Sequence, residues 1–343
     1  MQNINQTLGQ YSELFMLLAA LAYTVGFLAF TWDLVKSSRR IREIEAGLAE
    51  SANDRELVLA GAVAGGKRGK AAADGAPAGS TADDAMDYQG ERRSAARIAV
   101  ALTIVASAIH AVAVVTRGVA AGRVPWGNMY EFCTTGGLVV AVVFLLVLTR
   151  KDLRFLGTFV IGLVVVMLCA ATIGFPTPVA NLVPALQSYW LIIHVSVAVA
   201  ASALFTLTFA MSVLQLIQAS RVARLAAGDD DRLPFMRLVP SALSLENLSY
   251  RINAIAFVLW TFTLMAGAIW AEKAWGRYWG WDTKEVWTFV IWVVYAGYLH
   301  ARATRGWTGT RAAWLSIVGY LCIVFNFTIV NIYFSGLHSY AGV

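Results

Sequence analysis

The chain has 343 residues, of which 58% are hydrophobic and 14% are charged, and its mean hydropathy is +0.62. Soluble proteins contain about 25% charged residues, so this composition excludes a water-soluble globular fold. It predicts an all-α, polytopic membrane helix bundle. The formal net charge of +6 fits basic cytoplasmic loops, and we expect no nucleic-acid partner.

Stretches of about 20 apolar residues can cross a bilayer as helices. The sequence contains eight such stretches, of which the third is short and the fifth is long enough to extend beyond the bilayer. They cover residues 12–35, 95–116, 133–149, 155–174, 188–218, 252–272, 285–301 and 312–334.

Lys and Arg are concentrated in alternate loops between these stretches. They follow the first and fifth stretches, precede the second, and fill the loops between the third and fourth and between the seventh and eighth. Because cytoplasmic loops are the basic ones, we predict that both termini lie outside. The high Ala, Val and Arg content favours a bacterial chain, and therefore a multi-pass protein of the bacterial cytoplasmic membrane.

Three regions follow from this pattern. Residues 1–36 contain the first transmembrane helix. Residues 37–94 begin with a charged, potentially helical piece and become rich in Ala, Gly and Asp, which predicts a mostly disordered cytoplasmic linker. Residues 95–343 form the main membrane domain, with an outer loop at 272–286. Residues 240–250 predict a short amphipathic helix on the inner surface.

The outer loop is the most informative segment of the chain. It reads Trp275-Gly-Arg-Tyr-Trp279-Gly-Trp281-Asp282-Thr-Lys284-Glu285. Tryptophan is common at any membrane interface, but the concentration of rings in one loop favours a flat aromatic ligand such as haem. Ring faces stack on such ligands, each pair contributing about 0.5–1.5 kcal/mol beyond burial.

The charged residues of this loop suit the same ligand. Arg277, Lys273 or Lys284 would pair with haem propionates, and Asp282 would orient them or cap the seventh helix. The residues predicted to stack on haem or to position it are Trp275, Trp279, Trp281, Asp282, Arg277, Lys284 and Glu285.

Two of the four histidines are predicted at the same face as the loop. His194 is six residues into the fifth stretch, and His338 lies just past the eighth. Imidazole on both faces of a haem iron gives a six-coordinate site. We therefore predict that both are axial ligands; the alternative is a pair of interfacial histidines with unrelated hydrogen bonds.

The other two histidines lie at different depths. His300 is 300 − 285 = 15 residues beyond Glu285, about 22 Å down a helix, so it falls in the inner half of the bilayer. An ionisable residue there is a functional candidate. His110 falls in the outer half, roughly 12 Å away in depth. A haem on His300 would therefore take its opposite ligand from another chain, and His110 is interpreted as a hydrogen-bonded intramembrane histidine.

A second outer loop precedes the third stretch and is rich in turn residues. Either it is a structured re-entrant turn or it shapes the ligand pocket. The pocket-shaping candidates are Pro125, Asn128, Tyr130 and Glu131.

These residues resemble the CcsA/ResC family of cytochrome c assembly proteins, the haem-handling membrane subunit of the system II cytochrome c synthase. Trp275 to Glu285 is similar to the family's WWD signature, WGxxWxWDxKE, and Gly122 to Glu131 is similar to GxxPxxNxYE. Residues 184–194 and 335–340 resemble the two outer-histidine motifs, and residues 298–307 resemble the transmembrane-histidine segment. The resemblance covers about residues 95–343.

The resemblance implies a haem lyase subunit that is active only with its partner. Haem b would enter near His300, a site shared with a ResB-like membrane subunit. It would then move across the membrane and be ligated by His194 and His338 under the loop. The reaction would attach haem to the CxxCH thiols of apocytochrome c outside the membrane. A thiol-reducing thioredoxin-like protein is a further candidate partner. The linker at 37–94 is not part of the family signature, and no ResB-like region is fused to this chain.

Three alternatives remain at this stage. The haem-delivery subunit of the system I pathway shares the WWD signature. A membrane transporter of an aromatic solute, without lyase activity, would not need the histidines. A b-type electron-transfer cytochrome would need histidine pairs at matching depth, a condition that His110 and His300 do not meet. The chain contains no CxxCH of its own, so it is not itself a c-type cytochrome, and without a CxxC pair no thiol-redox motif is indicated.

Overall fold

The computed structural model describes residues 4–63, 84–87 and 93–338, and all regular structure in these residues is helical. The predicted fold class, a polytopic helix bundle, is confirmed. The α-helices are α1 (Gln6–Val63), α2 (Ser94–Ala121), α3 (Met129–Leu148), α4 (Gly157–Cys169), α5 (Tyr189–Ala226), α6 (Ala242–Trp275), α7 (Thr283–Arg305), α8 (Thr310–Phe327) and α9 (Ile329–Tyr333). Short helical turns are η1 (Arg154–Leu156), η2 (Ala170–Gly174), η3 (Pro184–Leu186) and η4 (Pro234–Leu238).

Seven membrane-competent segments are found among the described helices. They are Gln6–Glu43, Ser94–Ala121, Met129–Leu148, Arg154–Gly174, Tyr189–Ala226, Ala242–Trp275 and Thr310–Tyr333. The seventh predicted stretch, 285–301, forms α7, but this helix is not among the seven. Trp, Tyr, His and charged residues take up much of its sequence, and they lower its hydropathy. The predicted count of eight spans is therefore not confirmed.

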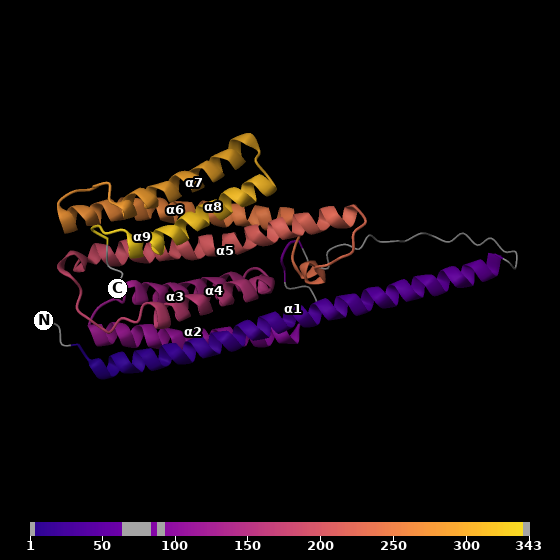
Figure 1. Ribbon diagram of the computed structural model, residues 1–343, viewed down its shortest axis with the longest axis horizontal. Coiled ribbons are helices and arrows are strands. Elements are labelled where there is room, and N and C mark those ends of the chain that lie inside the picture. The colour runs from indigo at the N-terminus through magenta and orange to yellow at the C-terminus, as the bar shows by residue number, and fades with distance from the viewer. Residues whose placement is uncertain (1–3, 64–83, 88–92, 339–343) are drawn as a thin grey trace.

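The helices pack in two halves that share α5 (Figure 1). One half has α1 with α2, and α3 with α4; the other has α6, α7 and α8. Leu207 of α5 belongs to the apolar cluster of the first half, whereas Phe205 packs in the second against Trp260 and Tyr295. A helix with two buried faces explains why α5 reads as apolar all round.

At the pole of the bundle where α1 begins, specific capping residues start and end the helices. α1, α3, α5 and α7 begin there, and α2, α6 and α9 end there, at the left in Figure 1. Asn128 caps α3 by accepting the Glu131 amide at 2.9 Å, and Ser188 caps α5. Gly122 and Gly276 end α2 and α6 in the left-handed conformation that glycine favours. The Arg-rich loops lie at the opposite pole.

Two predicted regions look different in the structure. α1 is helical to Val63, well past residue 36, and much of the predicted linker, 64–83 and 88–92, lies outside the described residues. The linker assignment stays a prediction. The predicted inner helix at 240–250 is the start of α6 and continues into that helix without a break.

Candidate functional site

A cleft opens at the pole where α1 begins. It lies between α3, α5, α6, α7 and the α8–α9 junction, and its empty volume, including the part open to solvent, is about 1120 Å³. Its walls are mainly aromatic and apolar, with a few polar groups among them. Trp126, Phe132, Trp260, Trp270, Trp279 and Phe327 supply rings, and Asn128, His194, Lys284, Glu285, Asn326, Asn331 and His338 supply polar atoms.

His194 enters the cleft from the first turns of α5. Its Nδ1 lies 3.0 Å from the carbonyl oxygen of Thr263 on α6, and its ring stacks on Trp270 with centroids 5.8 Å apart. Gly267 makes this approach possible, because a Cβ there would lie 2.8 Å from Cε1 of the imidazole.

His338 reaches the same cleft from the segment after α9. Its Nδ1 lies 3.2 Å from Oδ2 of Asp282. Its ring meets Trp275 and Trp270 edge-on, with centroids 4.9 and 5.9 Å away. Gly336 lets the segment pass close to Asp282, because a Cβ there would lie 2.7 Å from the carboxylate.

The two imidazoles are held in the same way. The Thr263 carbonyl can only accept a hydrogen bond, so it places the His194 proton on Nδ1. The hydrogen bond from His338 is the largest effect that holds the pKa of Asp282 below its ordinary value. Asp282 is therefore an ionised acceptor at neutral pH and fixes the His338 proton on Nδ1. Each ring is left with Nε2 for a metal, the arrangement usual for metal-ligating histidines.

The tryptophans of the loop take different positions. Trp279 lines the cleft, and Trp275 packs on Trp270 at 5.1 Å between centroids. Trp281 is 76% exposed and has φ of +60°. Bulky residues seldom adopt this conformation, and strain of this kind clusters at functional sites.

Glu285 holds the loop in shape from inside. Its Oε2 accepts the amides of Gly280 and Asp282 at 2.8 and 3.1 Å, which completes a capping box at the start of α7. Its Oε1 lies 3.5 Å from Arg277 Nη1. The Arg277 guanidinium packs flat on Gly280, where a Cβ would lie only 1.3 Å from Nη1.

Lys284 lies in the cleft lining and joins α7 to the α8–α9 junction. Its ammonium donates to the carbonyl of Asn326 at 2.8 Å and to Oδ1 of Asn331 at 2.7 Å, and it lies 4.4 Å from the Phe327 ring centroid. It thus caps the carbonyl end of α8 and supports the segment that carries His338. Lys273, by contrast, is largely exposed and pairs with Glu272 at 3.0 Å.

The second loop contributes one wall of the cleft. Asn128 and Trp126 line the cleft, whereas Pro125, Tyr130 and Glu131 are not among its lining residues. The backbone carbonyl of Pro125 accepts a hydrogen bond from the Thr135 hydroxyl at 3.3 Å. The buried guanidinium of Arg117 lies over the Tyr130 ring, 4.3 Å from its centroid.

The remaining histidines lie outside the cleft lining. His300 is exposed on α7, toward the pole opposite the cleft. His110 is buried between α2 and its neighbours, with Nδ1 3.4 Å from the Tyr23 hydroxyl. This agrees with its interpretation as a hydrogen-bonded intramembrane histidine.

Sequence reasoning missed several residues of the cleft. Trp270 touches both histidines, yet it reads as one more aromatic residue in an apolar stretch. The only indication in the sequence that Trp270 belongs to the cleft is its position five residues before Trp275. Gly267 lies three residues before Trp270, on the same helix face. Thr263 acts through its backbone carbonyl, which no side-chain pattern can reveal.

A model of the cytochrome c assembly protein family matches residues 126–338, the part of the chain that supplies both histidines, the loop and the cleft walls. The chain belongs to the CcsA family of cytochrome c assembly proteins. It is 34% identical over 253 residues to CcsA of Guillardia theta, covering 69% of this chain and 83% of that protein. CcsA of Synechococcus sp. (strain RCC307) is 34% identical over 272 residues, covering 73% and 86%. CcsA of Prochlorococcus marinus (strain MIT 9313) is 34% identical over 264 residues, covering 70% and 82%.

The predicted CcsA family is thus confirmed. The protein is a multi-pass membrane protein with a role in cytochrome c biogenesis. Cytochrome c assembly implies the handling of haem.

Proposed function

We propose that this CcsA-family protein holds haem b between His194 and His338 and presents it for covalent attachment to apocytochrome c. The observation that carries the proposal is the matched hydrogen bonding of the two imidazoles. Thr263 and Asp282 each engage an Nδ1, so both Nε2 lone pairs are available to iron. An unrelated pair of interfacial histidines gives no reason for this symmetry or for a shared contact with Trp270.

The cleft suits the rest of the haem as well. Its aromatic rings would stack on the porphyrin, and its cations would pair with the propionates. Burial lowers the pKa of Lys284 to about 7. Its ammonium form has three N–H donors, of which the protein uses two, and a propionate at the third would favour that charged form. Arg277, whose side chain is 33% exposed, would bind a propionate at the mouth.

The reaction would be the addition of each client thiol across a haem vinyl group. A carbon–sulfur bond forms, the thiol hydrogen goes to the neighbouring vinyl carbon, and the step has no net oxidation or reduction. It needs free thiols and reduced iron, so a thiol-reducing thioredoxin-like protein would serve it. Because His338 and its partner Asp282 would hold the iron, positioning would be the main catalytic contribution of the cleft.

His300 would form a separate inner site where haem is taken up. An imidazole exposed on α7 is available to a second membrane subunit, and we propose a ResB-like partner that completes the site and makes the lyase active. The Arg-rich loops lie at the pole opposite the cleft, which supports an extracytoplasmic cleft in a bacterial cytoplasmic membrane.

Covalent attachment is the property to test. The protein would be produced with its ResB-like partner and a CxxCH reporter apocytochrome in bacteria that lack their own assembly system. Haem that stays on the reporter after denaturation measures thioether formation. We expect it with both subunits, and we expect loss without the partner or with His194→Gly and His338→Gly together.

The same experiment separates the alternatives. Haem bound to the complex without any attachment to the reporter would favour a transporter without lyase activity. Attachment that needs system I subunits in place of the ResB-like protein would favour the haem-delivery alternative. A complex free of haem would refute the proposal.

A further inference from the structure

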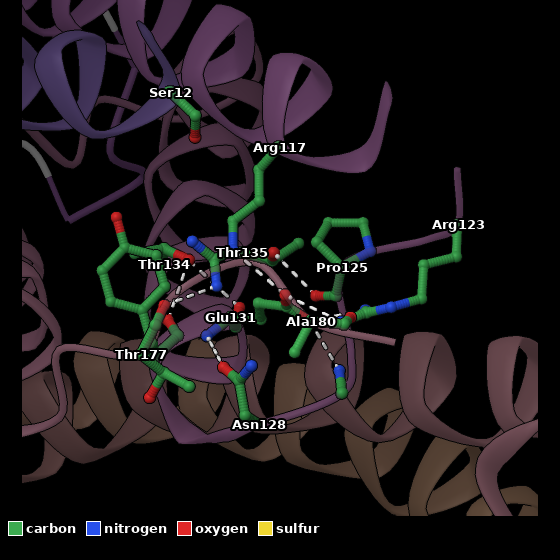
Figure 2. Close-up of polar contacts among 12 residues, drawn as sticks. Ser12, Arg117, Arg123, Pro125, Asn128, Glu131, Thr134, Thr135, Thr177 and Ala180 are labelled. Carbon is green, nitrogen blue, oxygen red and sulfur yellow. Dashed lines mark hydrogen bonds and ion pairs between the residues drawn. The ribbon is translucent and has the colours of Figure 1, made fainter. Parts of the chain in front are cut away.

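Close to Trp126 in the sequence, but outside the cleft lining, one buried carboxylate binds two arginines (Figure 2). Glu131 on the first turn of α3 is 0% exposed. Its Oε1 accepts from Arg117 Nε at 3.0 Å and from Arg123 Nη2 at 3.1 Å, and its Oε2 accepts from Arg123 Nη1 at 2.8 Å. Arg117 is itself 1% exposed. Such a cluster is costly to desolvate and contributes little to stability over an apolar replacement.

The cluster holds two loops that the helices alone do not fix. Glu131 also accepts the Gly127 amide at 2.7 Å, which ties down residues 122–128. The two arginines then reach the segment between η2 and η3. Arg117 Nη2 donates to the Thr177 carbonyl at 2.8 Å, and Arg123 Nη2 donates to the Ala180 carbonyl at 3.0 Å.

Both loops end in the part of the cleft wall that packs against Trp270. The first carries Trp126 and Asn128 into the lining, and the second leads to Leu186. They touch each other, because a Cβ on Gly127 would lie 2.6 Å from the Leu182 side chain. Trp126, Leu182, Leu186 and Trp270 pack in one apolar cluster, and Trp270 stacks on His194.

We infer that Glu131 is a positioning residue for haem: through Arg117, Arg123 and Gly127 it sets the part of the cleft wall that packs against Trp270, the ring that contacts both histidines. This inference rests on the proposed haem function of the cleft. Glu131 does not line the cleft, so it would act through the wall and make no contact with haem or client.

The chain contains a matched control at its other pole. Asp231 accepts from Arg221 at 2.6 and 2.9 Å and from Arg237 at 3.1 Å. This cluster also joins two arginines to one poorly exposed carboxylate, and it lies far from the cleft along α5. Asp231→Asn therefore reproduces the loss of charge pairing without touching the cleft wall.

The experiment compares Glu131→Gln, Asp231→Asn and the parent, each purified with the ResB-like partner. Thermal midpoint, haem per protein and the reduced absorption spectrum are measured for each. We expect both variants to lower the midpoint. Only Glu131→Gln should lower haem affinity, by about tenfold, and shift the Soret and α bands, and added imidazole should not restore them because both ligands are present.

Gly127→Ala keeps the inference testable if Glu131→Gln does not fold. Its added methyl meets Leu182 and the Arg123 guanidinium, so it moves the wall without removing a charge, and it should shift the bands in the same direction. Parent-like spectra and haem content in both Glu131→Gln and Gly127→Ala, or equal losses in Asp231→Asn, would overturn the inference. If His194→Gly with His338→Gly also leaves the spectrum unchanged, the proposed function itself fails.

Discussion

Replacing Asp282 by asparagine separates its two roles. The carboxylate caps α7 and also fixes the proton of His338 through a hydrogen bond of 3.2 Å. Asparagine caps helices about as well as aspartate, so the capping function is retained. The amide keeps one acceptor oxygen, which the cap uses, and replaces the other oxygen by an NH2 donor that cannot accept Nδ1–H. The tautomer and orientation of His338 are then no longer enforced.

The expected effect on haem is larger than the effect on folding. Loss of a group that orients a metal-ligating histidine typically weakens metal binding by about 10–100-fold, which is about 1.4–2.7 kcal/mol. Loss of a negative charge at the start of α7 costs about 0.3–1 kcal/mol of helix stability. We therefore predict a clear fall in haem affinity with a small fall in thermal midpoint.

Haem titration followed by absorbance, beside a thermal melt, measures both quantities. Glu272→Gln is the control, because it removes a carboxylate at the same pole that pairs with Lys273 and not with either histidine. Asp282→Asn with parent-like haem affinity, or Glu272→Gln with the same loss, would refute the role given to this hydrogen bond.

The pH dependence has a defined sign. Because the pKa of Asp282 is lowered in the folded protein, its contribution is complete above the ordinary value of 3.8 and disappears as the pH falls through the lowered pKa. The parent should lose stability in that acid range, and Asp282→Asn should lose less in the same melts.

Substitutions at three other positions have distinct expected outcomes. Gly267→Ala should weaken haem binding about tenfold, because the new methyl would displace His194. Gly297→Ala is the control, because a Cβ there meets nothing within 4 Å. It should leave haem binding unchanged and raise the stability of the helix by up to about 1 kcal/mol. Trp281→Gly should keep or raise the thermal midpoint, because it relieves a positive φ at an exposed side chain, while haem attachment to the reporter falls. Asp231→Asn should destabilise the protein by about 1–3 kcal/mol at pH 7. The hydrogen bond from Arg221 lowers the pKa of Asp231 to about 2 in the folded protein. The difference in stability between the parent and Asp231→Asn should therefore shrink as the pH falls below 3.8 toward 2.

The sequence was sufficient to predict the bundle and to select the two outer histidines. Long apolar stretches form helices in a membrane because a helix satisfies all of its own backbone hydrogen bonds, and the basic loops predict which pole faces the cytoplasm. Together these placed His194, His338 and the Trp275–Glu285 loop at one pole, where the structure brings the histidines to a common cleft.

What the sequence could not provide depends on packing between distant elements. The partner of His194 is a backbone carbonyl of α6, and backbone atoms carry no residue signature. Lys284 was predicted to pair with propionates, but its place at the carbonyl end of α8 depends on how α8 breaks near Thr328. α7 illustrates a third limit, because hydropathy alone does not distinguish a polar helix held in a bundle from a span exposed to lipid.

Bis-histidine ligation is tested most directly by the absorption spectrum of the detergent-purified protein with its ResB-like partner, beside a His194→Gly/His338→Gly variant. We predict a Soret band with sharp reduced α and β bands in the parent, altered bands in the variant, and recovery on addition of imidazole. A parent without haem, or identical spectra from the two proteins, would contradict bis-histidine ligation in the cleft.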